Sequence, residues 1–426
     1  MQAQQPVNNN LSPYQKGIIA ILAFIQFTVV LDFMVLSPLG AQLLTELSIT
    51  TAQFGWVVSG YAFSAGVSGL LTAGFADRFD RKKLLLFFYS GFVLGTLFCG
   101  LAPNFEALLA ARIITGLFGG VISSIGFAII TDLFDWQMRG RVMGFVQMSF
   151  AASQVLGIPV GLFLANNYGW HSPFRMIVAV SILVGLFMVW YMKPVTGHLT
   201  LQTDNNPFRH LMHTVSQPTY LRGFAATVLL ATGGFMLMPF GSTYAIHNLG
   251  VTADQLPLIY TITGVFSIGL GPIMGRLSDK TGKFNLFTYA SIWGIAVTII
   301  YCNLGQTPLW GIIGLNVLLF VGISGRMISS QAMISAVPEA KDRGAFMSVN
   351  ASIQQVAGGV ASLVAGLIVV QRPDGYLEQY PLLGYIVSAA TIITIFMMRW
   401  INNHINKKQA GAKAVPPAVA AGDQVA

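Results

Sequence analysis

Long apolar runs alternate with short polar segments along almost the whole chain. Most of the runs are long enough for an α-helix to cross a hydrocarbon core of about 30 Å. A membrane β-barrel would instead show segments of about ten residues with alternating polarity. The pattern therefore predicts an all-α membrane protein with twelve spanning helices, at residues 17–40, 54–76, 84–102, 105–134, 141–165, 173–192, 220–246, 256–277, 284–304, 309–337, 344–370 and 382–401.

A polar stretch in the middle of the chain separates six apolar runs from the six that follow. The first run follows a polar tail and is too long for the apolar region of a signal peptide, so we expect it to be retained as a helix. The end of the chain is rich in Ala, Pro, Gly and Lys, which predicts disorder. The expected parts are an N-terminal cytoplasmic tail (1–16), a six-helix bundle (17–193), a central cytoplasmic loop (194–219), a second six-helix bundle (220–401) and a disordered cytoplasmic tail (402–426).

The composition supports a membrane location, because 54% of the residues are hydrophobic and only 9% are charged. Soluble domains have about 25% charged residues. Most Lys and Arg residues fall in loops on one predicted side, and such loops stay in the cytoplasm. Both termini should then be cytoplasmic. The protein itself is expected in the plasma (inner) membrane of a bacterial cell. The same bias explains the net charge of +8 without a nucleic-acid partner.

Two short charged turns indicate an internal duplication. Asp77 and Asp279 each follow an apolar run and precede basic residues, and they are 279 − 77 = 202 residues apart. A second pair, Arg139 and Arg343, has nearly the same offset, 343 − 139 = 204. Repeats at about half the chain length favour two equivalent halves. We expect these halves to be related by an axis along the membrane normal, with Asp77 and Asp279 in equivalent places.

The two turns resemble the signature of the major facilitator superfamily between its helices 2 and 3. The first turn matches it at Asp77, Arg78, Arg81 and Lys82, and Asp80 replaces the glycine of the turn. The second turn matches it at Gly275, Leu277, Asp279, Gly282 and Lys283. Helix count, repeat and motif position extend the resemblance over residues 17–401. It implies two pseudo-symmetric six-helix bundles and a secondary transporter that works by alternating access.

Two further motifs resemble one branch of this superfamily. Arg112 and Gly116 fit a helix-4 pattern of proton-coupled members, and Gly157, Pro159 and Gly161 fit part of the helix-5 antiporter motif. Together they are most similar to the twelve-helix drug:proton antiporters. The resemblance implies proton-coupled efflux of small amphipathic or drug-like molecules. Gly157, Pro159 and Gly161 are expected to bend their helix, with simple helix packing as the alternative.

Asp32 is the acid that falls well inside a predicted membrane helix. A charge at the bilayer centre costs about 2.5 to 3.5 kcal/mol on insertion scales, so such a residue is a functional candidate. At a helical rise of about 1.5 Å per residue, Asp32 lies about 12 Å and Arg112 about 10 Å from the outer ends of their helices. We expect the two to face one cavity and to couple transport to protons. A fixed ion pair or a protonated helix contact is the alternative.

A second set of charged residues and glycines lies at the cytoplasmic helix ends. The resemblance implies that Asp77 accepts hydrogen bonds from the start of helix 11 near Arg343, and that Arg81 pairs with Asp132. Such contacts would latch one conformation, although a solvated basic turn is the alternative. The expected latch comprises Asp77, Arg78, Arg81, Asp132, Gly275, Asp279, Gly282, Lys283 and Arg343.

Aromatic and amide side chains in the central parts of the helices are candidates for the substrate cavity. They suit an amphipathic, weakly polar or cationic solute, although an arginine among them could favour an anionic group. The candidates are Tyr61, Gln147, Gln154, Phe235, Phe240, Arg326, Asn350 and Gln354.

Other function classes find little support. Cys99 and Cys302 are isolated in apolar runs, so we expect no disulfide, metal site or cofactor. The segment from Thr281 to Phe284 lacks the earlier glycine of a phosphate-binding loop, which argues against an ATP-driven pump, and no G-x-S-x-G motif indicates an intramembrane enzyme. A sugar, siderophore or other metabolite exporter, a proton symporter and a non-transporting receptor stay open. The expected partners are a small-molecule substrate, protons and membrane lipids, and the protein is expected to be a monomer.

Overall fold

The computed structural model describes residues 11–72, 76–197, 199, 214–339 and 342–414. In this part of the chain, twelve helices are long and apolar enough to cross a membrane. The predicted all-α fold with twelve spans is therefore confirmed, and the chain is an integral membrane protein. The central loop predicted at 194–219 lies largely outside the described residues, as does most of the N-terminal tail.

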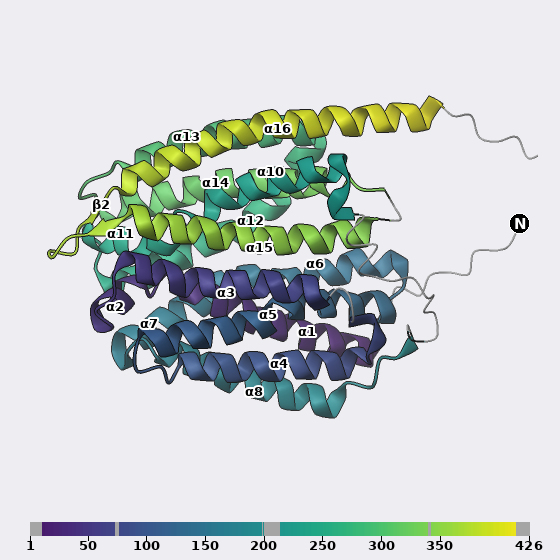
Figure 1. Cartoon of the computed structure of the whole chain (residues 1–426), viewed down its shortest axis with the longest axis horizontal. Helices are drawn as coiled ribbons and strands as arrows, with labels where there is room; N and C mark the ends of the chain where they lie inside the picture. The colour runs from purple at the N-terminus through teal and green to yellow at the C-terminus, as the bar shows by residue number, and fades with distance from the viewer. Residues whose placement is uncertain (1–10, 73–75, 198, 200–213, 340–341, 415–426) are drawn as a thin grey trace, which may run out of the picture.

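The N-terminal half forms one bundle and the C-terminal half a second bundle beside it (Figure 1). The first bundle contains α1 (Pro13–Val35), α2 (Gly40–Glu46), α3 (Thr51–Thr72), η1 (Ala76–Arg78), α4 (Arg81–Cys99), α5 (Phe105–Leu133), α6 (Trp136–Ala152), η2 (Ser153–Gly157), α7 (Ile158–Tyr168) and α8 (Ser172–Tyr191). The second contains α10 (Pro218–Phe235), η4 (Met238–Phe240), α11 (Gly241–His247), η5 (Ala253–Gln255), α12 (Leu256–Thr281), α13 (Lys283–Cys302), α14 (Leu309–Ile334), α15 (Arg343–Ile368), β1 (Val370–Gln371), β2 (Leu377–Glu378) and α16 (Tyr380–Ala414).

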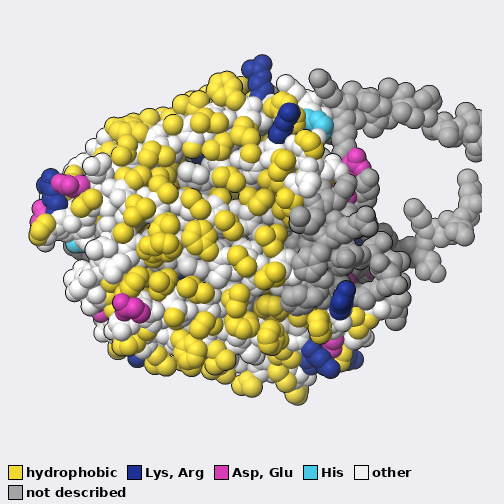
Figure 2. Space-filling model, in the orientation of Figure 1, with side chains coloured by type: hydrophobic (Ala, Val, Ile, Leu, Met, Phe, Trp, Pro, Cys, Tyr) yellow, Lys and Arg dark blue, Asp and Glu magenta, His cyan; other side chains and the backbone are white. Residues whose placement is uncertain are grey.

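The two ends of the molecule differ in chemistry. One end, here called the basic end, is where α4, α13 and α15 begin with Arg81, Lys283 and Arg343. The opposite end, the hairpin end, carries α2, α11 and the antiparallel strands β1 and β2 (Figure 1). Hydrophobic side chains cover the middle of the visible face, and charged ones gather towards both ends (Figure 2). This distribution is that of a protein whose middle lies in hydrocarbon.

Helices α3 and α15 lie side by side where the bundles meet (Figure 1). Glycines permit this approach: a methyl group on Gly366 would lie 2.7 Å from the Thr51 carbonyl oxygen, and one on Gly66 would lie 2.6 Å from a Val356 methyl. Small residues are typical of membrane helices in close contact, because packing rather than the hydrophobic effect holds such helices together.

The two charged turns have different local structures, although both lie at the basic end. Asp77 lies in the short helix η1, after α3 has ended at Thr72, whereas Asp279 lies inside α12. Helix α12 ends two residues later at Thr281, and the φ of 88° at the following residue, Gly282, favours glycine. In the first turn, Asp80 replaces the motif glycine and caps α4, because its carboxylate accepts hydrogen bonds from the amides of Lys82 and Val195, both at 2.9 Å.

The last helix is longer than the sequence predicted. Helix α16 continues beyond residue 401 to Ala414, which corrects the expectation of a disordered tail from residue 402. The physical reason lies in the composition of this stretch, where Ala, Lys and Gln favour a helix and the first proline follows only at Pro416. Residues 415–426 of the expected tail lie outside the described residues.

Candidate functional site

A buried ion pair joins α1 to α5. Arg112 Nη1 lies 2.7 Å from Asp32 Oδ2, and the two side chains are 1% and 0% exposed. The same Nη1 also lies 3.4 Å from the Asp32 carbonyl oxygen. From α4, the Thr96 hydroxyl donates a hydrogen bond of 3.2 Å to the other carboxylate oxygen, Oδ1. Both carboxylate oxygens therefore have a donor, as an ionised buried acid requires.

Tyr61 of α3 completes the surroundings of this pair. The guanidinium carbon of Arg112 lies 4.5 Å from the centre of the Tyr61 ring, a cation–π contact. Helices α3 and α5 approach closely at Gly116, where a methyl group would lie 2.3 Å from the Tyr61 carbonyl oxygen. The arginine's Nε is buried without a hydrogen-bond partner among the described residues, so Asp32 does not hold Arg112 through the full guanidinium fork.

A small hollow of about 10 Å³, room for about one water molecule, lies between the bundles, one aromatic ring away from Tyr61. Phe33 borders this hollow and also contacts Tyr61. Its ring centre is 5.4 Å from that of Tyr61 and 5.8 Å from that of Phe235. The lining comes from both bundles: Phe33, Leu36, Ser37, Val58, Phe235, Met238, Pro239 and Ser362. A rearrangement at the bundle interface can therefore reach the ion pair through two rings.

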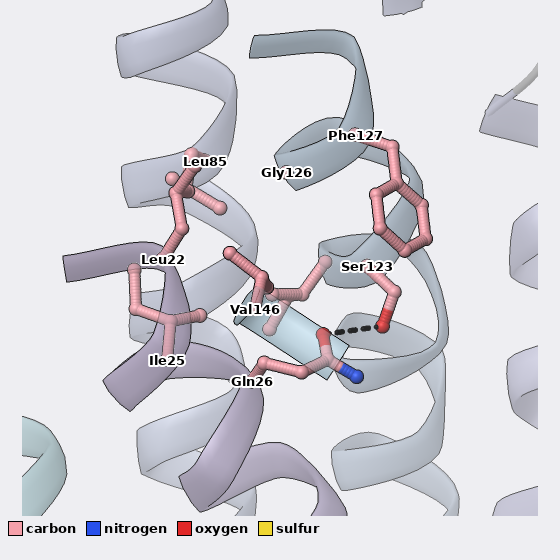
Figure 3. A pocket seen from close by; sticks show the side chains of 9 residues that line it. Leu22, Ile25, Gln26, Leu85, Ser123, Gly126, Phe127 and Val146 are labelled. Carbon is pink, nitrogen blue, oxygen red and sulfur yellow. Dashed lines mark hydrogen bonds between the residues drawn. The ribbon is translucent and has the colours of Figure 1, made fainter. Parts of the chain in front are cut away.

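A second hollow, also of about 10 Å³, lies inside the N-terminal bundle between α1, α4, α5 and α6 (Figure 3). Its polar wall is formed by Gln26 and Ser123, whose hydroxyl donates a hydrogen bond of 2.8 Å to Gln26 Oε1. The rest of the lining is mainly apolar: Leu22, Ile25, Leu85, Ile122, Gly126, Phe127 and Val146. Sequence reasoning missed Gln26 and Ser123, although both are polar residues within apolar runs.

Comparisons with known proteins agree with this architecture. Residues 22–327 and 223–423 match the model of the Major Facilitator Superfamily. The chain belongs to this superfamily of transporters. The uncharacterized MFS-type transporter YceJ of Bacillus subtilis is 29% identical over 263 residues, which cover 61% of this chain and 66% of the relative.

Another relative and a solved structure are similar over more of their length. Multidrug resistance protein 2 of Bacillus subtilis is 22% identical over 67% of this chain and 73% of its own. The crystal structure of a bacterial homolog of the human lysosomal transporter Spinster, inward-facing and unoccupied, superposes with a TM-score of 0.70. It is 17% identical and the match covers 96% of this chain and 100% of that one, which shows a shared fold.

Most of the predicted cavity residues of this superfamily transporter do not border the two hollows. Phe235 borders the interface hollow, whereas Phe240 is fully buried edge-on against Phe54. Asn350 is also buried, and it accepts a hydrogen bond of 2.6 Å from Thr227. Contacts with neighbouring helices therefore keep Phe240 and Asn350 away from both hollows. The remaining candidates outside the ion pair are Gln147, which is exposed, Gln154, which is buried, and Gln354 and Arg326, which are half-buried.

At the basic end, the first charged turn of the superfamily signature forms an ordered set of contacts. Arg81 is buried, its Nε lies 3.2 Å from Asp132 Oδ2, and its Nη1 donates to the Ala76 carbonyl at 3.3 Å. Lys82 donates to the Val189 carbonyl at 3.0 Å, at the end of α8. Arg78 is exposed, and the side chain of Asp77 lies outside the described residues.

The second copy of the signature is more open. Asp279, Lys283 and Arg343 are exposed, and a methyl group on Gly275 would meet no atom within 4 Å. The buried acid in this region is Asp342, which sequence reasoning missed. It accepts a hydrogen bond of 2.9 Å from the Tyr220 hydroxyl at the start of α10. The two copies therefore share a position at the basic end but not their side-chain contacts.

The residues expected to bend helix 5 lie at a change of helix type. The π-helical segment η2 ends at Gly157, and α7 follows with Pro159 in its first turn. Proline has no amide hydrogen, and its ring clashes with the carbonyl four residues earlier, so a wider turn relieves the helix there. Gly157 also allows close contact with α1, because a methyl group there would lie 2.6 Å from Leu31 Cδ1, and Gly161 packs near Val35.

Proposed function

We propose that this transporter exports small amphipathic, drug-like organic molecules in exchange for protons, by alternating access. The observation that carries the proposal is the buried pair of Asp32 and Arg112 within the membrane-spanning bundle. A carboxylate at that depth is costly, and removing one member of a buried pair costs about 3 to 5 kcal/mol. A group that can be ionised when paired and neutral when separated suits a proton-exchange site.

The interface hollow supports a link between solute and proton. Its lining belongs to both bundles, so the binding of a solute there would depend on the relative position of the bundles. Phe33 connects the hollow to Tyr61, and Tyr61 lies against Arg112. In the proposed cycle, a solute in the hollow displaces these rings, separates Arg112 from Asp32, and so favours the neutral acid.

Hydrogen bonds at the hairpin end support one state of that cycle. The Ser242 hydroxyl donates to the Ser37 carbonyl at 2.7 Å, and Thr51 donates to the Val369 carbonyl at 2.6 Å. Asn166 adds a bond of 3.0 Å to the Ala253 carbonyl, so these bonds join the two bundles at three places. We propose that this end faces outward, that the basic end and both termini face the cytoplasm of a bacterial cell, and that a monomer in the inner membrane is the working unit.

The residues of the predicted latch fit the same scheme. The bond between Arg81 and Asp132 ties the start of α4 to the end of α5 within one bundle. We propose that this pair, with the signature residues around it, keeps the basic end of the first bundle rigid while the bundles rock against each other.

Proteoliposomes test the proposal through solute and proton movement measured together. With an imposed pH gradient and ethidium as the amphipathic probe, the wild type should accumulate ethidium while protons move in the opposite direction. Asp32→Asn, which mimics the neutral acid permanently, should still bind ethidium but should lose gradient-driven accumulation. Glu106→Gln is the matched control, because Glu106 is an exposed acid in the first turn of α5.

Each outcome of this experiment has a defined meaning. Undiminished gradient-driven accumulation by Asp32→Asn would remove Asp32 from the coupling step. Protons and solute moving in the same direction in the wild type would show a symporter. Binding without any flux in the wild type would favour a receptor.

A further inference from the structure

Arg326 occupies an unusual place in the C-terminal bundle. It lies on α14, and its guanidinium reaches across to α10, where a methyl group on Gly233 would lie 3.5 Å from Arg326 Nη2. The same methyl group would lie 3.9 Å from Val387 Cγ1 of α16, and a methyl group on Gly294 of α13 would lie 4.0 Å from Arg326 Cδ. Arg326 of α14 is therefore packed beside α10 and α13, with a glycine of each helix next to its side chain.

No protein group neutralises this arginine among the described residues. Arg326 has no hydrogen bond or ion pair there, and its Nε is buried without a partner. The sequences of the surrounding helices leave no candidate, because α10, α13, α14, α15 and α16 contain no Asp or Glu at all. In helix α12 the single acid is Asp279, which is exposed at the basic end.

The N-terminal bundle shows what is missing. There, an arginine on α5 faces an aspartate on α1, and here an arginine on α14 faces Gly233 on α10. Helices α5 and α14 hold corresponding positions in the two halves, as do α1 and α10, although Arg326 is not the repeat counterpart of Arg112. The second bundle thus has the cation of such a pair without its anion, and a charge this deep in a membrane protein needs a counter-charge.

The helix beside the guanidinium leads to the interface hollow. Helix α10 ends at Phe235, two residues after Gly233, and Phe235 borders the interface hollow. Gly234 is exposed, and a methyl group there would meet no atom within 4 Å. The end of α10 therefore borders the interface hollow and carries no bulky side chain at Gly233 and Gly234.

We propose that Arg326 binds the carboxylate of an amphipathic, singly charged organic acid. One guanidinium matches one carboxylate through two parallel hydrogen bonds, and the apolar surroundings favour a ligand whose remainder is hydrophobic. A polyanion would leave further charges without partners. The inference rests on the proposed function in that it assigns a substrate class to the same transporter, and it extends the solutes from neutral and cationic molecules to acids.

The test is a binding measurement without any gradient, on full-length protein in phosphatidylcholine nanodiscs. The probes are 2-naphthoate and 2-naphthamide, which share a ring system and differ in charge. The wild type should bind the acid at least tenfold more tightly than the amide. Arg326→Gln should lose about 10- to 100-fold in affinity for the acid and keep its affinity for the amide.

Two further variants make the result specific. Arg326→Lys keeps the charge without the fork and should retain part of the preference. Arg276→Gln, which removes an exposed arginine from α12, should retain all of it. Should Arg326→Gln fail to fold, an undiminished preference for the acid in Arg326→Lys would contradict bidentate recognition.

The inference and the proposed function can fail separately. Asp32→Asn should keep the preference for the acid, because the two sites lie in different bundles. Equal binding of both probes by the wild type, or an unchanged preference in Arg326→Gln, would overturn the assignment. Loss of naphthoate binding in nanodiscs that contain phosphatidylglycerol would overturn it too, since the anion would then be a lipid headgroup. Failure of proton-coupled ethidium transport with the acid preference intact would reject only the proposed function.

Discussion

At the scale of single residues, the Asp32 and Arg112 pair depends on neutral neighbours as much as on its two charges. Thr96 satisfies the carboxylate oxygen that Arg112 does not reach. Tyr61 covers the guanidinium with its ring, and no described hydrogen bond uses the Tyr61 hydroxyl. The ring rather than the hydroxyl is therefore the part of Tyr61 that stabilises the site.

This distinction gives a prediction for Tyr61. Tyr61→Phe keeps the aromatic face and should melt within error of the wild type, whereas Tyr61→Leu should lose about 1 to 2 kcal/mol with the desolvated cation–π contact. Thermal unfolding of the purified protein in detergent measures both. Equal melting temperatures for the Phe and Leu variants would show that the ring does not stabilise Arg112.

At the scale of elements, Asp80 and Lys82 of the first charged turn hold helix ends together at the basic end. Asp80 accepts from the first turn of α4 and from the loop after α8, so one carboxylate fixes two elements. Lys82 donates to carbonyls at the end of α8, where the helix dipole is negative. The turn therefore joins α4 and α8 as well as connecting α3 to α4.

Replacing Asp80 should be destabilising for this reason. Asp80→Ala removes two hydrogen bonds and should lower the free energy of unfolding by about 1 to 2 kcal/mol. Asp135→Ala is the matched control, because Asp135 holds the N-cap position of α6 without a side-chain capping bond. The two free energies can be compared by thermal or denaturant unfolding. A loss at Asp80 no greater than that at Asp135 would contradict the capping role.

At the scale of the whole molecule, the bundles meet along α3 and α15 and are joined by hydrogen bonds at the hairpin end. In the proposed alternating-access cycle, opening the hairpin end would require these bonds to break and others to form at the basic end. The equilibrium between the two states should therefore respond to a single bond.

Ser242→Ala removes the bond to the Ser37 carbonyl and should shift the population towards a state that is open at the hairpin end. With Ser37→Cys as the reporter, an impermeant thiol reagent should label Ser242→Ala several-fold faster than its Ser242 parent. Cys99 and Cys302 are buried and should contribute little background. A matched control is Ser330→Ala, a buried serine of α14 that bonds only within its own helix. Unchanged labelling in Ser242→Ala would mean that this bond does not hold the end closed.

The sequence by itself determined the number, order and approximate limits of the twelve spans. Hydrocarbon leaves every backbone amide to be satisfied within its own helix, so apolar length alone specifies a span. It also singled out Asp32 and Arg112, because charges are rare at that depth. Helix ends differ from the predicted limits: α16 extends to Ala414, and Asp279 lies inside α12 rather than in a turn, since helix formers continue past the apolar run.

Only the tertiary structure decided which polar residues meet. Thr96 and Tyr61 reach the ion pair from α4 and α3, and Gln26 meets Ser123 across a hollow that no spacing in the chain predicted. Phe240 and Asn350, expected at the cavity, are buried in packed contacts. The reason is physical: an apolar helix can present any face to lipid or protein at similar cost, so the rotation of each helix is fixed by its neighbours. Arg326 is a further example. Its position in the sequence predicted a cation within a membrane helix, but only the packing of the helices shows that no described acid pairs with it.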